Sequence, residues 1–146
     1  MIERIVVGYL ETNCYIFADL DTKEAALIDP GSNGGRIKRG IEKHGLHIKC
    51  IINTHGHGDH MGHAPQILAL LPTLQMYGVQ EHCNDIKARM APTPVNCTSI
   101  MAAGAQFGTE ANIPPNLIPG VELRAVKHPH SAGPAGKTAN GHFLRS

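Results

Sequence analysis

The sequence of 146 residues predicts one layered domain of the α/β or αββα type. Three short strand-like runs open the chain, helix-like and strand-like segments alternate after them, and a histidine cluster directly follows a buried strand. The length suits a single domain, and neither an internal repeat nor a linker divides it. We therefore expect one domain, residues 1–146, with a ligand-binding loop at the carboxyl end of a strand.

The first half of the chain predicts a small antiparallel meander followed by a helix and a buried strand. The meander strands are expected at residues 2–7, 13–18 and 24–29. In "GRIKRGIEKHG", Ile37 and Ile41 lie four residues apart and Gly45 ends the pattern, which indicates a short amphipathic helix. The apolar run "IKCIIN", residues 48–53, is typical of a buried strand.

The second half is less regular. A helix is expected over Gly62–Leu71, because Met61, Ala64, Leu68 and Leu71 share one face and Pro72 ends it. The other expected elements are a strand at 74–78, a helix at 79–90, a long loop at 91–120 and a strand at 121–126. The tail after residue 126 has little periodicity, and no Asp or Glu follows Glu122.

Composition limits the classes of function. The net charge is +1 and no basic block is longer than "RIKR", so nothing favours a nucleic-acid partner. No apolar run approaches the ~20 residues that span a bilayer, and the start does not resemble a signal peptide. We expect a cytoplasmic protein without a membrane partner. Its four cysteines form no C-x-x-C pair, so we expect buried or free thiols rather than disulfides.

Four histidines and one aspartate lie within nine residues in "HGHGDHMGH". His55 and His57 are two apart, so in extended backbone they point to the same side and converge on one cation. Asp59 and His60 then turn toward a second point nearby, while Gly56 and Gly58 allow a tight bend. Imidazole and carboxylate are ligands that Zn²⁺ and Fe²⁺ prefer. The sequence therefore predicts a metal site on this loop.

"THGHGDHMGH" after a buried strand, with "TNCYIF" and "LIDPGSN" upstream, resembles the metallo-β-lactamase superfamily, particularly its glyoxalase II-like hydrolases. The resemblance implies an αββα sandwich with a metal site at one rim, incomplete here in its C-terminal half. It implies that His55 and His57 bind a first metal ion, and Asp59 and His60 a second. Asp29 would be a structural residue of the loop around the site or a plain turn residue.

Two departures from the family pattern concern the later ligands. The family completes its first metal with a histidine from a later motif, which "VKHPHSAG" matches at His130, with His128 as the competitor. The family's bridging aspartate has no counterpart, because no carboxylate follows Glu122. A truncated or altered family member would have this pattern.

The resemblance implies metal-activated hydrolysis, with Asp59 orienting the nucleophile on zinc, and with iron or manganese as alternative metals. A thioester or ester such as an acyl-glutathione is the expected small-molecule substrate. Two alternatives stay open: a metal-binding but catalytically weak or inactive truncated fragment, which another chain could complete, and a mononuclear iron enzyme resembling persulfide dioxygenases. Elsewhere we interpret His44, His47, His63 and His82 as surface residues, and Cys14, Tyr15 and Tyr77 as core residues.

Overall fold

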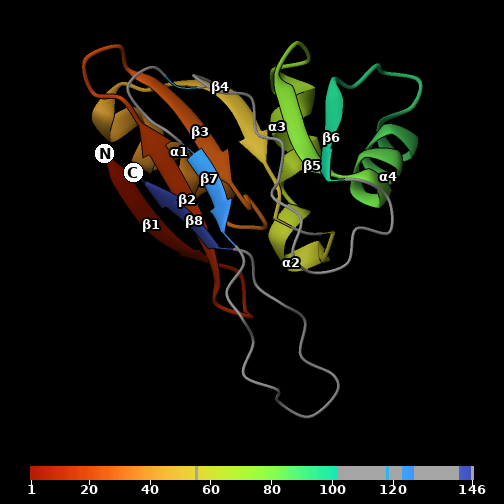
Figure 1. Cartoon of the computed structure of the whole chain (residues 1–146), viewed down its shortest axis with the longest axis horizontal. Coiled ribbons are helices and arrows are strands. Elements are labelled where there is room, and N and C mark those ends of the chain that lie inside the picture. The colour runs from red at the N-terminus through yellow and green to blue at the C-terminus, as the bar shows by residue number, and fades with distance from the viewer. Residues whose placement is uncertain (55, 102–117, 119–122, 127–141, 146) are drawn as a thin grey trace.

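Six strands side by side form the main sheet of the computed structural model, which describes residues 1–54, 56–101, 118, 123–126 and 142–145 (Figure 1). Along the sheet they follow the order of the chain. The strands are β1 (Ile2–Val7), β2 (Thr12–Ala18), β3 (Glu24–Ile28), β4 (His47–Ile52), β5 (Gln75–Val79) and β6 (Cys97–Met101). β1, β2 and β3 are antiparallel, as the meander predicted, and β3 to β6 are parallel.

The helices connect the strands of the main sheet, and two further antiparallel strands form a second sheet (Figure 1). The helices are α1 (Gly34–His44), α2 (Gly58–Met61), α3 (Ala64–Leu70) and α4 (Gln80–Met90), and the second sheet consists of β7 (Leu123–Val126) and β8 (His142–Arg145). None of the helices in the described ranges is long and apolar enough to cross a membrane.

Alternation along the strands divides the core into two parts. In β2, Cys14 and Ile16 face the larger cluster, which also contains Ile37, Leu68 and Ile86 from α1, α3 and α4. Burial of this face against the helices accounts for the amphipathic patterns in the sequence. The helices therefore cover one face of the main sheet.

The opposite face of the sheet is also buried. Its cluster consists of strand residues and one residue from far along the chain: Phe17, Ala26, Ile28, Cys50, Ile52, Tyr77 and Ile118. Tyr15 packs against this cluster, so the prediction that both tyrosines belong to the core is confirmed. Because both faces are buried, β3 and β4 have continuous apolar sequences rather than alternating ones.

Three elements differ from the sequence predictions. β6 lies in the segment expected to be a loop, since it gains its strand hydrogen bonds from pairing with β5, from Met76–Cys97 to Val79–Met101. β8 forms within the tail in the same way, by pairing with β7. Finally, the histidine motif contains the single helical turn α2 between the loop and α3. All three depend on contacts that a local pattern does not contain.

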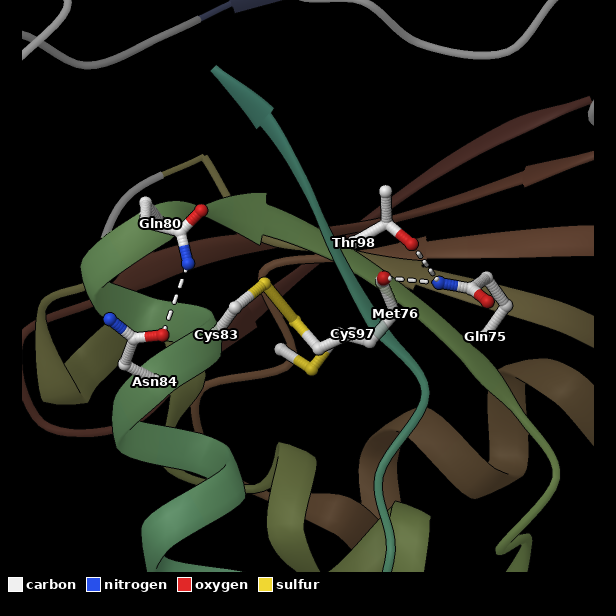
Figure 2. The surroundings of a disulfide bond; sticks show 7 residues. All are labelled: Gln75, Met76, Gln80, Cys83, Asn84, Cys97 and Thr98. Atoms are coloured by element: carbon white, nitrogen blue, oxygen red, sulfur yellow. Dashed lines mark hydrogen bonds between the residues drawn. A yellow bond between two sulfur atoms is a disulfide. The ribbon is translucent and has the colours of Figure 1, made fainter. Parts of the chain in front are cut away.

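A disulfide bond joins Cys83 of α4 to Cys97 of β6 (Figure 2). The expectation of free thiols is therefore wrong for this pair, because packing of α4 beside β6 brings two cysteines 14 residues apart to a Cα–Cα distance of 5.4 Å. The same figure shows Gln75 joining β5 to β6 through a 3.1 Å hydrogen bond from its Nε2 to the Thr98 hydroxyl.

Cys14 and Cys50 are free and buried, as the sequence predicted. Burial raises the pKa of each thiol to about 12, and the Asp29 carboxylate adds to the rise in the pKa of Cys14. Both therefore act as small apolar core residues rather than as nucleophiles.

Candidate metal centre

The strand order brings the polar residues of the motif to one edge of the sheet. β3 and β4 are parallel neighbours, so Asp29 and the loop from Asn53 onward leave the sheet at the same edge. β2 is antiparallel to β3, and its first residue, Thr12, starts at that edge too. Ligand sites of parallel α/β sheets form at the carboxyl ends of the strands.

Asp29 is the organising residue of this edge. Its side chain is 6% exposed and accepts four hydrogen bonds. The donors are Thr54 N at 2.7 Å, Thr54 Oγ1 at 2.6 Å, Asn53 Nδ2 at 3.3 Å and His60 Nδ1 at 2.9 Å. Asp29 therefore anchors the start of the motif loop and the ring of His60, so of the two interpretations of Asp29 the structural one is correct.

The His60 ring lies between two carboxylates. Its Nδ1 donates to Asp29, while its Nε2 is 3.3 Å from Asp59 Oδ2. That same oxygen accepts a 2.6 Å hydrogen bond from the hydroxyl of Thr12, a buried residue. Burial alone would lower the pKa of His60, but the hydrogen bond to Asp29 and the charges of Asp29 and Asp59 outweigh it and raise the pKa.

This arrangement fits a bound cation. With Nδ1 protonated toward Asp29, neutral His60 directs the lone pair of Nε2 at the Asp59 carboxylate, and two acceptors facing each other repel. Either a second proton on His60 or a metal ion between the two groups removes the repulsion. An imidazole whose other nitrogen donates to a carboxylate is the usual arrangement around metal-binding histidines.

The described residues do not form the complete ligand set. Among them, no three His, Cys, Asp or Glu side chains come together so as to hold a metal ion. His57 is exposed and precedes the first residue of α2. His55, His128 and His130 lie outside the described residues, so the assignments made for them stay predictions.

Backbone-to-backbone packing holds α2 in place. An added Cβ at Gly31 would overlap the carbonyl oxygen of Asp59, and one at Gly62 would lie 2.7 Å from the carbonyl oxygen of Gly31. His63 N donates to Pro30 O at 3.1 Å, and Asn53 Nδ2 donates to His60 O at 2.9 Å. The Asp-Pro-Gly loop and the histidine motif therefore form one compact unit.

The prediction that His82 lies at the surface is wrong. His82 is 1% exposed, in the first turn of α4, and neither ring nitrogen has a hydrogen-bond partner. Burial lowers its pKa, although the charges of Asp85 and Asp29 oppose the shift. The spacing gave a usable signal, because His82 lies four residues before buried Ile86 and so shares its helix face.

The other histidines discussed above differ in how far they are exposed to solvent. His47 is exposed as expected, whereas His44 is half-buried and contacts Glu3, with 2.9 Å between Nε2 and Oε2. His63 is also half-buried rather than fully solvent-facing, because its ring lies against Gly34 at the start of α1.

Comparison with known proteins identifies the family. The family model described as "Metallo-beta-lactamase superfamily" matches residues 7–130. The chain therefore belongs to the metallo-β-lactamase superfamily, and the predicted fold class is confirmed.

Individual relatives are similar over part of their length. Hydroxyacylglutathione hydrolase GloC of Haemophilus influenzae is 44% identical over 66 residues, 45% of this chain and 31% of that protein. ETHE1 from Myxococcus xanthus has a TM-score of 0.57 at 16% identity, covering 86% of this chain and 47% of that one. TTHA1623, solved in a di-iron-bound form, has a TM-score of 0.54 at 21% identity, covering 83% and 59%. The chain described here spans, in its alignments, about a third of the length of the curated relatives that it matches.

Proposed function

We propose that this chain is a metal-dependent hydrolase whose metal ions are held by His55, His57, Asp59, His60 and His130. Family membership supports the reaction class. The observation that carries the proposal is the contact chain from Asp29 through His60 to Asp59, in which both ring nitrogens of His60 face carboxylate oxygens. That geometry favours a positive charge at His60 and Asp59, and a bound metal ion would supply it where the family places its metal ligands.

Each of the described residues has a distinct task in this proposal. Asp29 holds the His60 ring with Nε2 toward Asp59, where these two residues would bind a metal ion, and the Thr12 hydroxyl donates to one oxygen of Asp59. Asp59 would bind metal and orient the attacking water. A metal bound here would lower the pKa of water toward ~7 and polarise the scissile carbonyl.

We infer that the substrate is a small thioester or ester such as an acyl-glutathione. The support is similarity to proteins named hydroxyacylglutathione hydrolase, of which the matched segment covers about a third. Zinc is the proposed metal, and the fold similarity to TTHA1623, whose structure contains two irons, keeps iron as the alternative. A cytoplasmic location also stays a prediction.

Metal content and hydrolysis test the proposal together. We expect purified protein to bind up to two zinc ions per chain and to cleave a hydroxyacylglutathione thioester. His57→Ala and Asp59→Ala should lose bound zinc and at least about 100-fold in kcat/KM, while His47→Ala, at an exposed position on β4, should change neither. Unchanged metal content in both site variants would refute the ligand assignment.

The same measurements separate the alternatives. One zinc ion or fewer per chain without hydrolysis favours a metal-binding chain that is not itself an enzyme. Bound iron, with oxygen uptake on a persulfide, favours the iron oxygenase.

A further inference from the structure

His82 is a buried polar residue that the proposed chemistry does not use. It is 1% exposed, and both its Nδ1 and its Nε2 are buried without a hydrogen-bond partner among the described residues. A buried polar atom without a hydrogen-bond partner destabilises a fold, so the two ring nitrogens of His82 need an explanation. An apolar residue at this position would avoid that cost.

His82 lies beside the motif loop. An added Cβ at Gly56 would lie 3.8 Å from the Cβ of His82, and one at Gly78 would lie 2.8 Å from Cδ2 of its ring. The ring of His82 therefore packs against Gly78 of β5, while its Cβ lies beside Gly56, in the part of the motif loop that leads into His57.

The start of the motif loop is held by side-chain hydrogen bonds to Asp29. Asp29 accepts hydrogen bonds from Asn53 and Thr54, which fix the start of the loop. At Gly56 the neighbouring side chain is His82, which has a donor and an acceptor nitrogen when neutral. Burial favours the neutral ring by lowering the pKa of His82.

Within the described part of the chain, His82 forms no group of three with other His, Cys, Asp or Glu side chains. Its charge environment includes Asp85 and Arg89 of its own helix and Asp29 of the site edge.

We propose that His82 is a positioning residue for the motif loop, the loop between β4 and α2. Its ring nitrogens hydrogen-bond the Gly56–His57 segment, directly or through one water molecule, when a metal ion is bound at the site. His82 then holds the segment that carries His57, as Asp29 holds the segment before it. This inference rests on the proposed metal binding and extends it to a residue of α4.

The first test compares zinc affinity with stability. The variant His82→Phe keeps a ring of similar shape but no nitrogen, so the metal-free protein should be at least as resistant to urea as the wild type. Its zinc affinity, measured by competition with a chromophoric chelator, should fall about 10- to 100-fold. A purely structural histidine would not separate the two measurements in this way.

Conservative variants identify the nitrogen involved. His82→Asn places an amide near the position of Nδ1 and His82→Gln near that of Nε2, and one of them should regain most of the zinc affinity. His47→Phe, at an exposed position, is the matched control and should bind zinc like the wild type. Equal zinc affinity of wild type and His82→Phe would overturn the role of His82 and leave the proposed function intact. Wild-type protein that binds no zinc would overturn both.

Nuclear magnetic resonance keeps the inference testable should His82→Phe fail to fold. Ring ¹⁵N shifts of His82 in the wild-type protein report which nitrogen carries hydrogen and whether it is hydrogen-bonded. We expect these shifts to change when zinc is added. Identical His82 shifts in the metal-free and zinc-loaded protein would refute the proposal.

Discussion

The carboxylate of Asp29 does more for the site than its place in a turn indicates. It stands at φ 50°, a left-handed conformation that Asp and Asn tolerate better than most residues, and it accepts hydrogen bonds from Asn53, Thr54 and His60. One buried side chain thus joins the end of β3 to the loop after β4. The left-handed backbone and the four acceptor contacts together explain why an aspartate occupies this position.

Asp29→Asn should therefore weaken the fold without straining the backbone. The amide keeps one acceptor oxygen but turns an NH₂ group toward Thr54 or His60, both of which donate to the wild-type carboxylate. We expect the free energy of unfolding to fall by roughly 2–4 kcal/mol, measured by urea denaturation of the metal-free protein. Asp21→Asn, at an exposed turn, is the control and should be neutral. Equal losses in both variants would contradict the role given to Asp29.

Single residues also mark the limit of sequence reasoning. Asp59 and His60 were predicted from spacing as a pair, and they do lie together. Thr12 was not predicted, because its contact with Asp59 joins residues 47 positions apart. His82 is predicted at the surface but is 1% exposed, because its helix face packs into the core. Polarity predicts exposure only on average.

At the scale of secondary-structure elements, α2 and the Asp-Pro-Gly loop pack through their backbones. An added Cβ at Gly31 would overlap the Asp59 carbonyl, which is backbone and has little room to move. At Gly58, the first residue of α2, an added Cβ would meet nothing within 4 Å. The two glycines lie close together in the site but differ completely in the space around them.

Gly31→Ala and Gly58→Ala form a matched pair of variants. We expect Gly31→Ala to lower the free energy of unfolding by about 1–3 kcal/mol, as overpacking does, and to weaken zinc binding by displacing Asp59. Gly58→Ala should leave both quantities close to the wild-type values. Urea denaturation and chelator competition measure them, and a normal zinc affinity in Gly31→Ala would refute the close-packed loop.

The disulfide bond between Cys83 and Cys97 also joins two elements, α4 and β6. Reducing it should lower the free energy of unfolding by about 3 kcal/mol, the value expected for a closed loop of 14 residues. Thiol titration of the unfolded, unreduced protein should find two reactive cysteines, and four after reduction. Four thiols without a reductant would show that the bond does not form. In the native state, Cys14 and Cys50 should react very slowly, because both are buried and their pKa values are raised.

At the scale of the whole molecule, the main sheet needs cover on both of its faces. α1, α3 and α4 cover one face, and Ile118 is a fully buried member of the cluster on the other. Ile118 lies 39 residues beyond the last residue of β5, Val79, which places part of the core far along the chain. The domain therefore depends on residues well outside the histidine motif.

Ile118→Ala tests this dependence. We expect a loss of about 2–5 kcal/mol in the free energy of unfolding, as for other large-to-small changes in a core. Leu70→Ala is the control, because Leu70 is 81% exposed at the end of α3 and should contribute little. Similar small effects of both substitutions in denaturant titrations would mean that Ile118 does not close the second face.

Local patterns were sufficient for the meander, for α1, for the buried strand β4 and for the position of the histidine motif after it. Each of these is written within a few neighbouring residues, as alternation, helical spacing or a cluster of ligand types. Contacts between distant segments decided the rest: the pairing of β6 with β5, the disulfide, the link from Thr12 to Asp59 and the burial of His82. Periodicity reports the environment of one segment, whereas these features depend on which segments meet, and only the folded chain determines that.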